Sequence, residues 1–407
     1  MKKILCCLAL IFVVFVIPVS AAETDSTQSQ DDAMFQEYYE QQAEDSGAND
    51  LPNYLPDDTK SQLDQMGISG VDWNSIQSIQ PNSVFSQILK MLGEGVQAPM
   101  KALLSLLGIM MLCALLGSMK INLGEKNMGG IMNLIGTLCI CMVVITPIVQ
   151  SIVKLTGVIQ GASTFMLACI PVLVGIMIAN GQTVTASSYN LLMLGTTNSI
   201  SFLSAHFLAP CMNIFLGFSV VSAISPTLRL STLCNTISKI VKWVLGFCMS
   251  VFTGLLTIQS LLGGSVDVTT NRTLRFVVSS FVPVVGSALG EALSTVQGCI
   301  KVLKGGVGAF GVLAVVFMFL PILIECLLWQ MTLTVCAGIG DVFDLKEITS
   351  ILNAASKVMS MMLAILLCTM AMMTISTVVV GVAIAVTAAA AQENDDEDDD
   401  PRASAAT

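Results

Sequence analysis

The sequence predicts an all-α, polytopic α-helical integral membrane protein, on the grounds of its composition, its charge distribution and its apolar runs. Of its 407 residues, 54% are hydrophobic and 11% are charged, whereas soluble domains carry roughly 25% charged residues. No Asp, Glu, Lys or Arg lies between Lys154 and Arg229. A soluble protein needs solvated side chains at much shorter intervals along its surface.

Residues 1–22 have the layout of a secretory signal peptide. Lys2 and Lys3 precede an apolar stretch that ends in small residues, as cleavable leaders do; an uncleaved anchor is the alternative. Residues 23–95 are polar and acidic, so we expect an exported, partly disordered segment with one or two short helices. A polytopic membrane domain is expected over 96–391 and an acidic disordered tail over 392–407.

Apolar runs of about 20 residues, the length that crosses a bilayer core of about 30 Å, predict seven to ten spans. They lie near 101–119, 128–149, 155–179, 189–208, 210–227, 243–263, 305–324, 325–343 and 358–387. The runs 189–227 and 305–343 each fit either two short helices around a proline or one bent, tilted helix.

Charges near the span ends give a topology test, because Lys and Arg favour the cytoplasmic side. If the first span runs inward, Lys120 and Arg229 share that side when four spans separate them, which favours two spans in 189–227. The shorter apolar stretch in 276–304 is typical of a re-entrant segment. Lys301 would then lie on the opposite side, and the sequence leaves this conflict open.

Two amphipathic helices are expected on the membrane surface. Arg229 to Val244 gathers Leu233 and Ile240 with other apolar residues on one face, and its basic side carries Arg229, Lys239 and Lys242, suited to anionic lipid. A shorter helix of the same kind is expected over 346–357.

A weak internal repeat relates Ile170–Gly175 to Val282–Gly286. Its prolines and the two that follow at similar spacing are candidate helix breaks: Pro171, Pro210, Pro283 and Pro321. Transporters place their midplane sites at such paired breaks. Chance similarity between apolar sequences is the alternative.

The chemistry-bearing residues argue against an enzyme. A single His excludes the usual catalytic sets, and scattered cysteines give no metal or cofactor site. Gly338–Asp341 carries the Gly-x-Gly-Asp motif of intramembrane aspartyl proteases, yet no second buried Asp is available. Gly306, Gly308 and Gly311 match a dinucleotide fingerprint only by letter, and without a preceding strand they indicate close helix packing.

Glu325 is the strongest candidate for a buried polar or pore-lining group. It is the one charge in Phe317–Trp329, and a carboxylate in such a run should face protein or water unless it lies near the interface. Gln330, Glu291 and His206 are weaker candidates. No basic patch with interleaved aromatic residues suggests a nucleic-acid partner.

Three strings, Thr269–Phe276, Phe281–Ser287 and Lys304–Gly311, resemble those of the stage III sporulation protein AE family. The resemblance extends over nearly the whole chain, although the acidic tail is unlike the family. It implies a multi-pass protein of the mother-cell membrane around the forespore, with an extracytoplasmic N-terminal segment and no enzymatic activity of its own.

The resemblance further implies a transenvelope, secretion-like channel that is needed for late forespore gene expression, with this chain as a permease-like core. Its expected partners are the other membrane proteins and the ATPase of the stage III sporulation A operon, stage II sporulation protein Q on the forespore side, and the lipid bilayer. Homo-oligomers are left open. The alternative is a stand-alone secondary transporter of a small solute, with Glu325 as its coupling or substrate group.

Overall fold

A computed structural model describes residues 31–72, 76, 81–123, 128–179, 181–224, 231–281 and 286–398. Its described side chains lie within 38–72, 76, 83–115, 135–179, 181–222, 232–259, 302–303 and 305–378. The predicted signal peptide, Arg229, Pro283 and residues 399–407 lie outside the described part.

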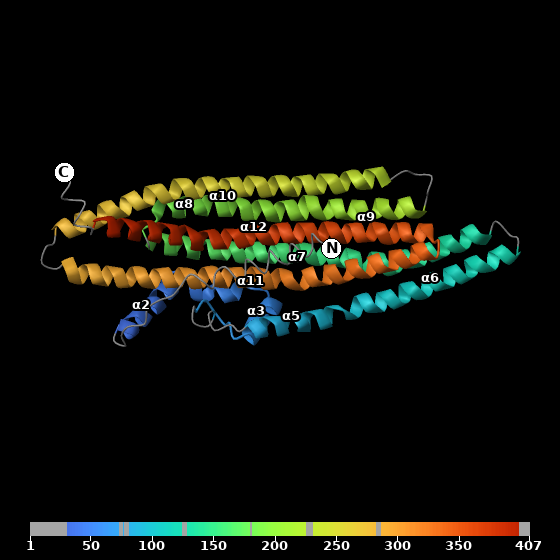
Figure 1. Ribbon diagram of the computed structural model, residues 1–407, viewed down its shortest axis with the longest axis horizontal. Coiled ribbons are helices and arrows are strands. Elements are labelled where there is room, and N and C mark those ends of the chain that lie inside the picture. The colour runs from blue at the N-terminus through green and yellow to red at the C-terminus, as the bar shows by residue number, and fades with distance from the viewer. Residues whose placement is uncertain are drawn as a thin grey trace.

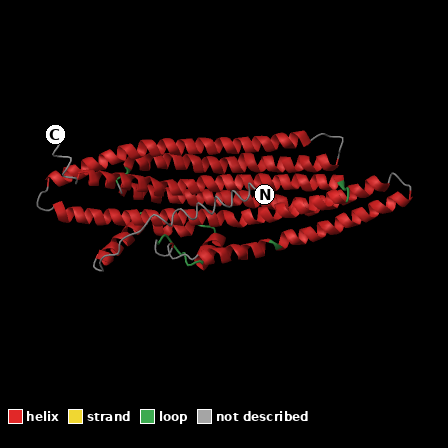
Figure 2. Ribbon diagram, in the orientation of Figure 1, coloured by secondary structure: helices red, strands yellow, loops and turns green. Residues whose placement is uncertain are grey.

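The described residues form helices and no strands, which confirms the all-α class (Figure 2). The long helices are α6 (Gln97–Leu123), α7 (Met128–Ala179), α8 (Thr183–Leu203), the π-helical η3 (Ser204–Leu208), α9 (Ala209–Ile224), α10 (Ser231–Phe281), α11 (Gly286–Val342) and α12 (Lys346–Asp398). Six passes in the described part, with α8, η3 and α9 counted as one, are long and apolar enough to cross a membrane. The protein is therefore a multi-pass membrane protein.

The helices form one elongated bundle (Figure 1). α7 and α12 pack at its centre, α11 lies along one side, and α8, α9 and α10 lie along the other. Four N-terminal helices, α2 (Asp31–Asp45), η2 (Ala48–Tyr54), α3 (Asp57–Gln65) and α5 (Pro81–Gly95), lie on the α11 side. Segments from opposite ends of the chain therefore meet on one flank of the bundle.

The helices are much longer than the predicted spans. α7 has 52 residues, about 78 Å at 1.5 Å per residue, whereas a bilayer core is about 30 Å thick. The expected pair 128–149/155–179 is thus a single helix, and 305–343 lies in one helix, which is the second of the two alternatives left open for that run. The described part has six passes, fewer than the seven to ten that were expected. Dividing apolar sequence into 20-residue units fails in α7 because the polar residues Gln150, Ser151 and Lys154 lie within a continuous helix.

Prolines do not break these helices, contrary to the prediction for Pro171 and Pro321. Pro147 and Pro171 lie inside α7, and Pro321 lies inside α11. Proline is tolerated in membrane helices where neighbouring groups satisfy the freed backbone. Pro210 lies in the first turn of α9, directly after η3, whose wider π turn makes room for a proline ring.

The re-entrant prediction for 276–304 stays a prediction, because residues 276–281 end α10 and 286–304 begin α11 while 282–285 lie outside the described part. The predicted surface helix is not a separate helix in the described residues. The basic stretch is the first part of α10, where Leu233 and Ile240 are exposed and Val241 is buried.

The stretch 346–357 likewise begins α12, and that helix continues to Asp398 into the tail that was predicted to be disordered. Only two passes, α7 and α8–η3–α9, separate Lys120 from the start of α10. Any even number of passes, two as well as four, places the two basic regions on the same side of the membrane. The two basic regions therefore share one end of the bundle without two spans in 189–227.

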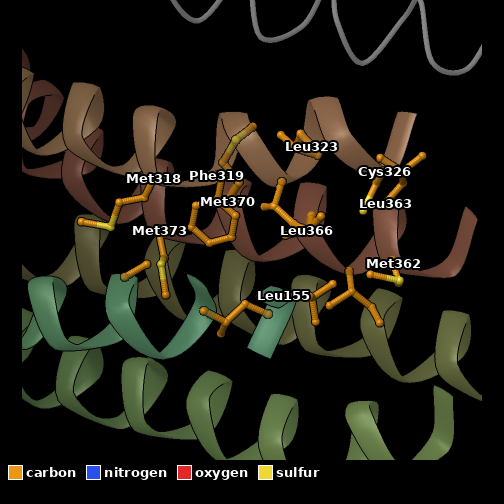
Figure 3. Packing of buried hydrophobic residues seen from close by; sticks show 14 of the residues in the cluster. Leu155, Met318, Phe319, Leu323, Cys326, Met362, Leu363, Leu366, Met370 and Met373 are labelled. Atoms are coloured by element: carbon orange, nitrogen blue, oxygen red, sulfur yellow. The ribbon is translucent and has the colours of Figure 1, made fainter. Parts of the chain in front are cut away.

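Tight packing of α11 on α12 forms the centre of the core (Figure 3). Flexible side chains such as Met318, Met362, Met370 and Met373 interleave there with Phe319 and several leucines, as methionine does in irregular gaps. A Cβ on Gly311 would lie 3.2 Å from Cγ2 of Thr377 in α12. The small residue thus permits the close approach that the sequence indicated.

The N-terminal segment, residues 39–71, docks on α7 and α11 at two other glycines. The Tyr39 hydroxyl donates to the Val71 carbonyl (3.2 Å), and a Cβ on Gly306 would overlap that carbonyl oxygen. A Cβ on Gly161 would lie 3.6 Å from Cγ of Pro56. Ala48, Leu51, Leu63 and Ile68 of this segment are at most 1% exposed, so the docking buries a real apolar core.

Gly306→Ala should therefore loosen the docked segment, because the new Cβ displaces the Val71 carbonyl. Gly308→Ala is the matched control, since its Cβ would lie 3.8 Å from the Thr377 carbonyl oxygen, and both changes gain the same helix propensity of about 0.5–1 kcal/mol. Limited proteolysis in detergent should cleave residues 39–71 several times faster in Gly306→Ala alone. Equal cleavage rates in the two variants would contradict the docking.

Candidate functional site

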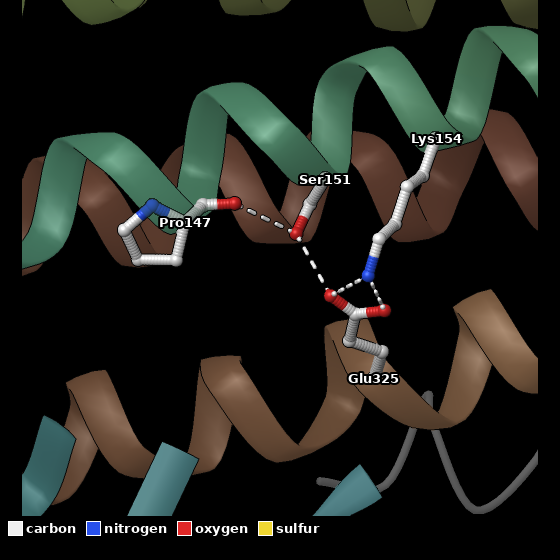
Figure 4. A network of polar contacts seen from close by, with 4 residues as sticks. All are labelled: Pro147, Ser151, Lys154 and Glu325. Atoms are coloured by element: carbon white, nitrogen blue, oxygen red, sulfur yellow. Dashed lines mark hydrogen bonds and ion pairs between the residues drawn. The ribbon is translucent and has the colours of Figure 1, made fainter. Parts of the chain in front are cut away.

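An ion pair joins the two long helices α7 and α11 (Figure 4). The Nζ of Lys154 in α7 lies 2.9 Å from Oε2 and 3.1 Å from Oε1 of Glu325 in α11. The other ion pair among the described residues, Lys346 with Asp344, lies at the exposed connection between α11 and α12. The bidentate geometry favours a charge-assisted, well-oriented contact.

Ser151 extends the pair into a small polar network. Its hydroxyl lies 2.9 Å from the carbonyl oxygen of Pro147 and 3.4 Å from Oε1 of Glu325, so it is shared between two acceptors. Pro147, Ser151 and Lys154 all belong to α7 and follow one another at intervals of about one turn (Figure 4). The seryl hydroxyl thus bonds the backbone carbonyl of a turn that contains proline while it supports the carboxylate.

The Lys154–Glu325 ion pair lies at one end of long uncharged runs in α7 and α11, and a similar run in α10 begins after Lys242. No charge occurs in 155–179 of α7, 243–266 of α10 or 305–324 of α11. Contacts between Thr334 and Ser356 (3.3 Å) and between Lys357 and Asn235 (3.5 Å) align α11, α12 and α10. Counting along the helices from these contacts places Glu325 and Lys242 at about the same level. Each run is long enough to cross a bilayer core.

The flank that carries the ion pair has charged side chains over the same uncharged level, beside exposed apolar residues such as Val153 of α7. The side chain of Lys154 is 57% exposed and that of Glu325 is 25% exposed, whereas a charge against lipid costs about 2.5–3.5 kcal/mol on insertion scales. The docked segment 39–71 covers α7 at Gly161 and α11 at Gly306. Its exposed carboxylates are Glu40, Glu44, Asp45, Asp50, Asp57, Asp58 and Asp64.

The flank formed by α10 has the opposite character. Trp243, Phe247, Val251, Leu255 and Ile258 are 44–69% exposed and recur three or four residues apart, which puts them on one face of the helix. The rings of Trp243 and Phe247 stack at 5.7 Å. An exposed apolar stripe of this length in a membrane protein suits lipid.

The remaining predicted residues do not join this network. Gln330 lies about one turn farther along α11, and its Oε1 is buried without a hydrogen-bond partner among the described residues. Glu291 lies in the first turns of α11, and its side chain is outside the described part. His206 is exposed in η3, where its ring stacks on Phe202 at 4.6 Å. Lys239 and Lys242 are exposed on α10.

Lys154 and Ser151 were missed as site residues. Lys154 is the only charge in the 52 residues of α7, and this isolation, the same signal that singled out Glu325, was available in the sequence. The pairing itself joins residues 171 positions apart and has no local signature. Within the described residues, no three His, Cys, Asp or Glu side chains gather where they could hold a metal ion.

Reversing one charge of the pair should destabilise the bundle, because two like charges would then face each other between packed helices. Lys154→Glu and Glu325→Lys should each lower the free energy of unfolding by about 2 kcal/mol or more, and the double reversal should recover most of the loss. Ser151→Ala is the control and should cost about 1 kcal/mol or less. Thermal unfolding in detergent measures all four; additive losses in the double variant would argue against the pair.

Comparison with known proteins identifies the family. A family model described as stage III sporulation protein AE matches residues 72–385, which begin directly after the docked segment. Stage III sporulation protein AE of Bacillus subtilis (strain 168) is 23% identical over 239 residues, 59% of this chain and 60% of the relative, so the chain matches about three fifths of that protein's length. No solved structure matches. Because the family model covers well over half of the chain, this protein belongs to the stage III sporulation protein AE family, and its role lies in sporulation.

Proposed function

We propose that this protein is a pore-lining membrane subunit of a transenvelope channel that links mother cell and forespore during sporulation and is needed for late forespore gene expression. In this proposal the flank formed by α7, α11 and the docked segment faces water inside an assembly. The flank formed by α10 and α8 faces lipid. The chain acts as a structural, permease-like component rather than as an enzyme.

The observation that carries the proposal is the contrast between the two flanks at one level of the bundle. Lys154, Glu325 and an acidic segment lie on one side of sequence that is otherwise uncharged, and exposed apolar side chains line the other side. The ion pair lies level with Lys242, at one end of the uncharged runs, but the acidic segment extends along those runs to Gly161 and Gly306. A protein surrounded by lipid on all sides would pay for each carboxylate of that segment. An aqueous interior shared with partner subunits removes that cost.

The helix directions support an orientation for this subunit. The helices alternate in direction, so the α6–α7, α9–α10 and α11–α12 connections share one end of the bundle (Figure 1). In sequence these connections and their surroundings carry Lys120, Lys126, Arg229, Lys239 and Lys346. The positive-inside rule favours the mother-cell cytoplasm for this end. The exported segment and the end of α12 would then lie on the opposite, extracytoplasmic side.

Partners would meet the subunit on its exported, acidic segment and along the water-facing flank. The other membrane proteins of the same operon and stage II sporulation protein Q are the proposed partners. The chain has no Walker A motif, so the energy for transport would come from the separate ATPase of the operon.

The carrier alternative loses its main support. It depended on helices broken by proline near the midplane, whereas α7 and α11 run continuously through Pro171 and Pro321. Glu325 is also engaged by Lys154 instead of standing alone as a coupling group.

A sporulation assay tests the proposal. Cells that lack the gene should grow normally but leave a fluorescent reporter of late forespore transcription silent after engulfment. Lys154→Leu/Glu325→Leu should fail to restore the reporter, because it makes the water-facing flank apolar. The charge-reversed pair Lys154→Glu/Glu325→Lys, which keeps both charges, should restore it.

Immunoblots of the membrane fraction would show that both variants accumulate to equal levels. A bright reporter in the deletion strain, or full restoration by the double leucine variant, would overturn the proposed function.

A further inference from the structure

A groove runs between α10 and α12 on the side of the bundle away from the docked segment. Its volume is about 350 Å³, and it is lined by Lys242 at one end and then by Leu245, Gly246, Met249, Ala364 and Leu367. The floor is therefore apolar, and the cation stands at the mouth. The groove therefore has a charged end and an apolar end, which complement the headgroup and the acyl chain of a lipid.

The two helices that form the groove run parallel and in register. Nζ of Lys357 lies 3.5 Å from Oδ1 of Asn235, and Sγ of Cys368 lies 3.9 Å from the carbonyl oxygen of Leu245. The sequence offset is nearly the same in both contacts, so the groove follows one line between the helices. Successive turns toward Met249 and Leu367 extend its apolar floor.

Three lysines gather at the mouth of the groove. Lys239 and Lys242 are three residues apart on α10, hence on one face. Lys357 of α12 lies beside Asn235, about one turn before Lys239 and two turns before Lys242. All three are exposed, and none forms an ion pair with a carboxylate of the described residues. This end of the groove therefore carries positive charge that no described acidic side chain neutralises.

The surroundings of the groove point to the membrane interface. Trp243, next to Lys242, is 69% exposed, and amphipathic tryptophan rings concentrate at headgroup level. The exposed stripe of α10 continues from there in the direction of the groove floor. Lysines at one level with an apolar path beyond them match a headgroup and its acyl chain.

We propose that this groove binds an anionic phospholipid, with its phosphate at Lys239, Lys242 and Lys357 and one acyl chain along Gly246 and Met249. The inference rests on the lipid-facing assignment of α10 in the proposed function. A free phosphate would use the lysines but not the apolar floor, and a partner helix would leave three cations without counter-charge. Charge complementarity together with an apolar floor selects the lipid.

Gly246 allows a test that leaves the charges in place. No atom lies within 4 Å of a Cβ built on Gly246, so a leucine there fills the groove without a clash. The triple variant Lys239→Gln/Lys242→Gln/Lys357→Gln removes the charges and leaves the floor intact. Lys346→Gln is the control, because this lysine lies near the same end of the bundle but pairs with Asp344.

Bound lipid would be counted by native mass spectrometry of the full chain after release from nanodiscs of phosphatidylglycerol or of phosphatidylcholine. The wild type and Lys346→Gln should retain phosphatidylglycerol and not phosphatidylcholine. The triple variant should bind it roughly a hundredfold more weakly, since each such lysine contributes about 1 kcal/mol. Gly246→Leu should lose it as well, and millimolar inorganic phosphate should not displace it.

Equal retention of the two lipids, displacement by inorganic phosphate, or unchanged retention in Gly246→Leu would each overturn the lipid site. Circular dichroism would check that the variants keep their helix content. The readout is bound lipid rather than sporulation, so it can fail while the channel proposal stands. Conversely, a bright reporter in the deletion strain would overturn the channel proposal without changing the amount of lipid bound to the purified protein.

Discussion

The Lys154–Glu325 contact joins α7 and α11 where neither helix carries another charge for many residues. A charge in such a run is tolerated only beside a counter-charge, other polar groups or water. Lys154 and Glu325 are each other's counter-charge, and Ser151 supplies a further hydrogen bond to the carboxylate. The half-exposed lysine lies level with Lys242, where water or lipid headgroups can meet its outer side, and the docked acidic segment extends the charge along the α7–α11 flank.

Helix continuity then sets the scale of the molecule. Helices such as α7 and α11 extend well beyond a bilayer core, and the prolines inside them do not divide them. The same bundle can therefore carry a docked polar segment on one flank, an apolar stripe on the other and basic residues at one end. Glycines make this compact: Gly311 admits Thr377 of α12, and Gly306 admits the backbone of Val71.

The sequence was informative where the signal is local and silent where it is not. A lone carboxylate in an apolar run singled out Glu325, and small residues at 306–311 indicated close packing. Its partner Lys154 lies 171 residues away, so only tertiary structure joins them. The 20-residue length rule misdivided α7, because it assumes that helices end where a membrane would, whereas for 305–343 in α11 it left the single helix open.

The central claim is that water reaches the α7–α11 flank and lipid covers the α10 flank. It is tested most directly by thiol labelling in membranes of sporulating cells, with Lys154→Cys and Leu255→Cys introduced separately into a chain whose native cysteines are replaced by alanine. A membrane-impermeant maleimide should label the cysteine at position 154 and spare the one at 255. Protection of both positions, or labelling at 255 alone, would contradict the account.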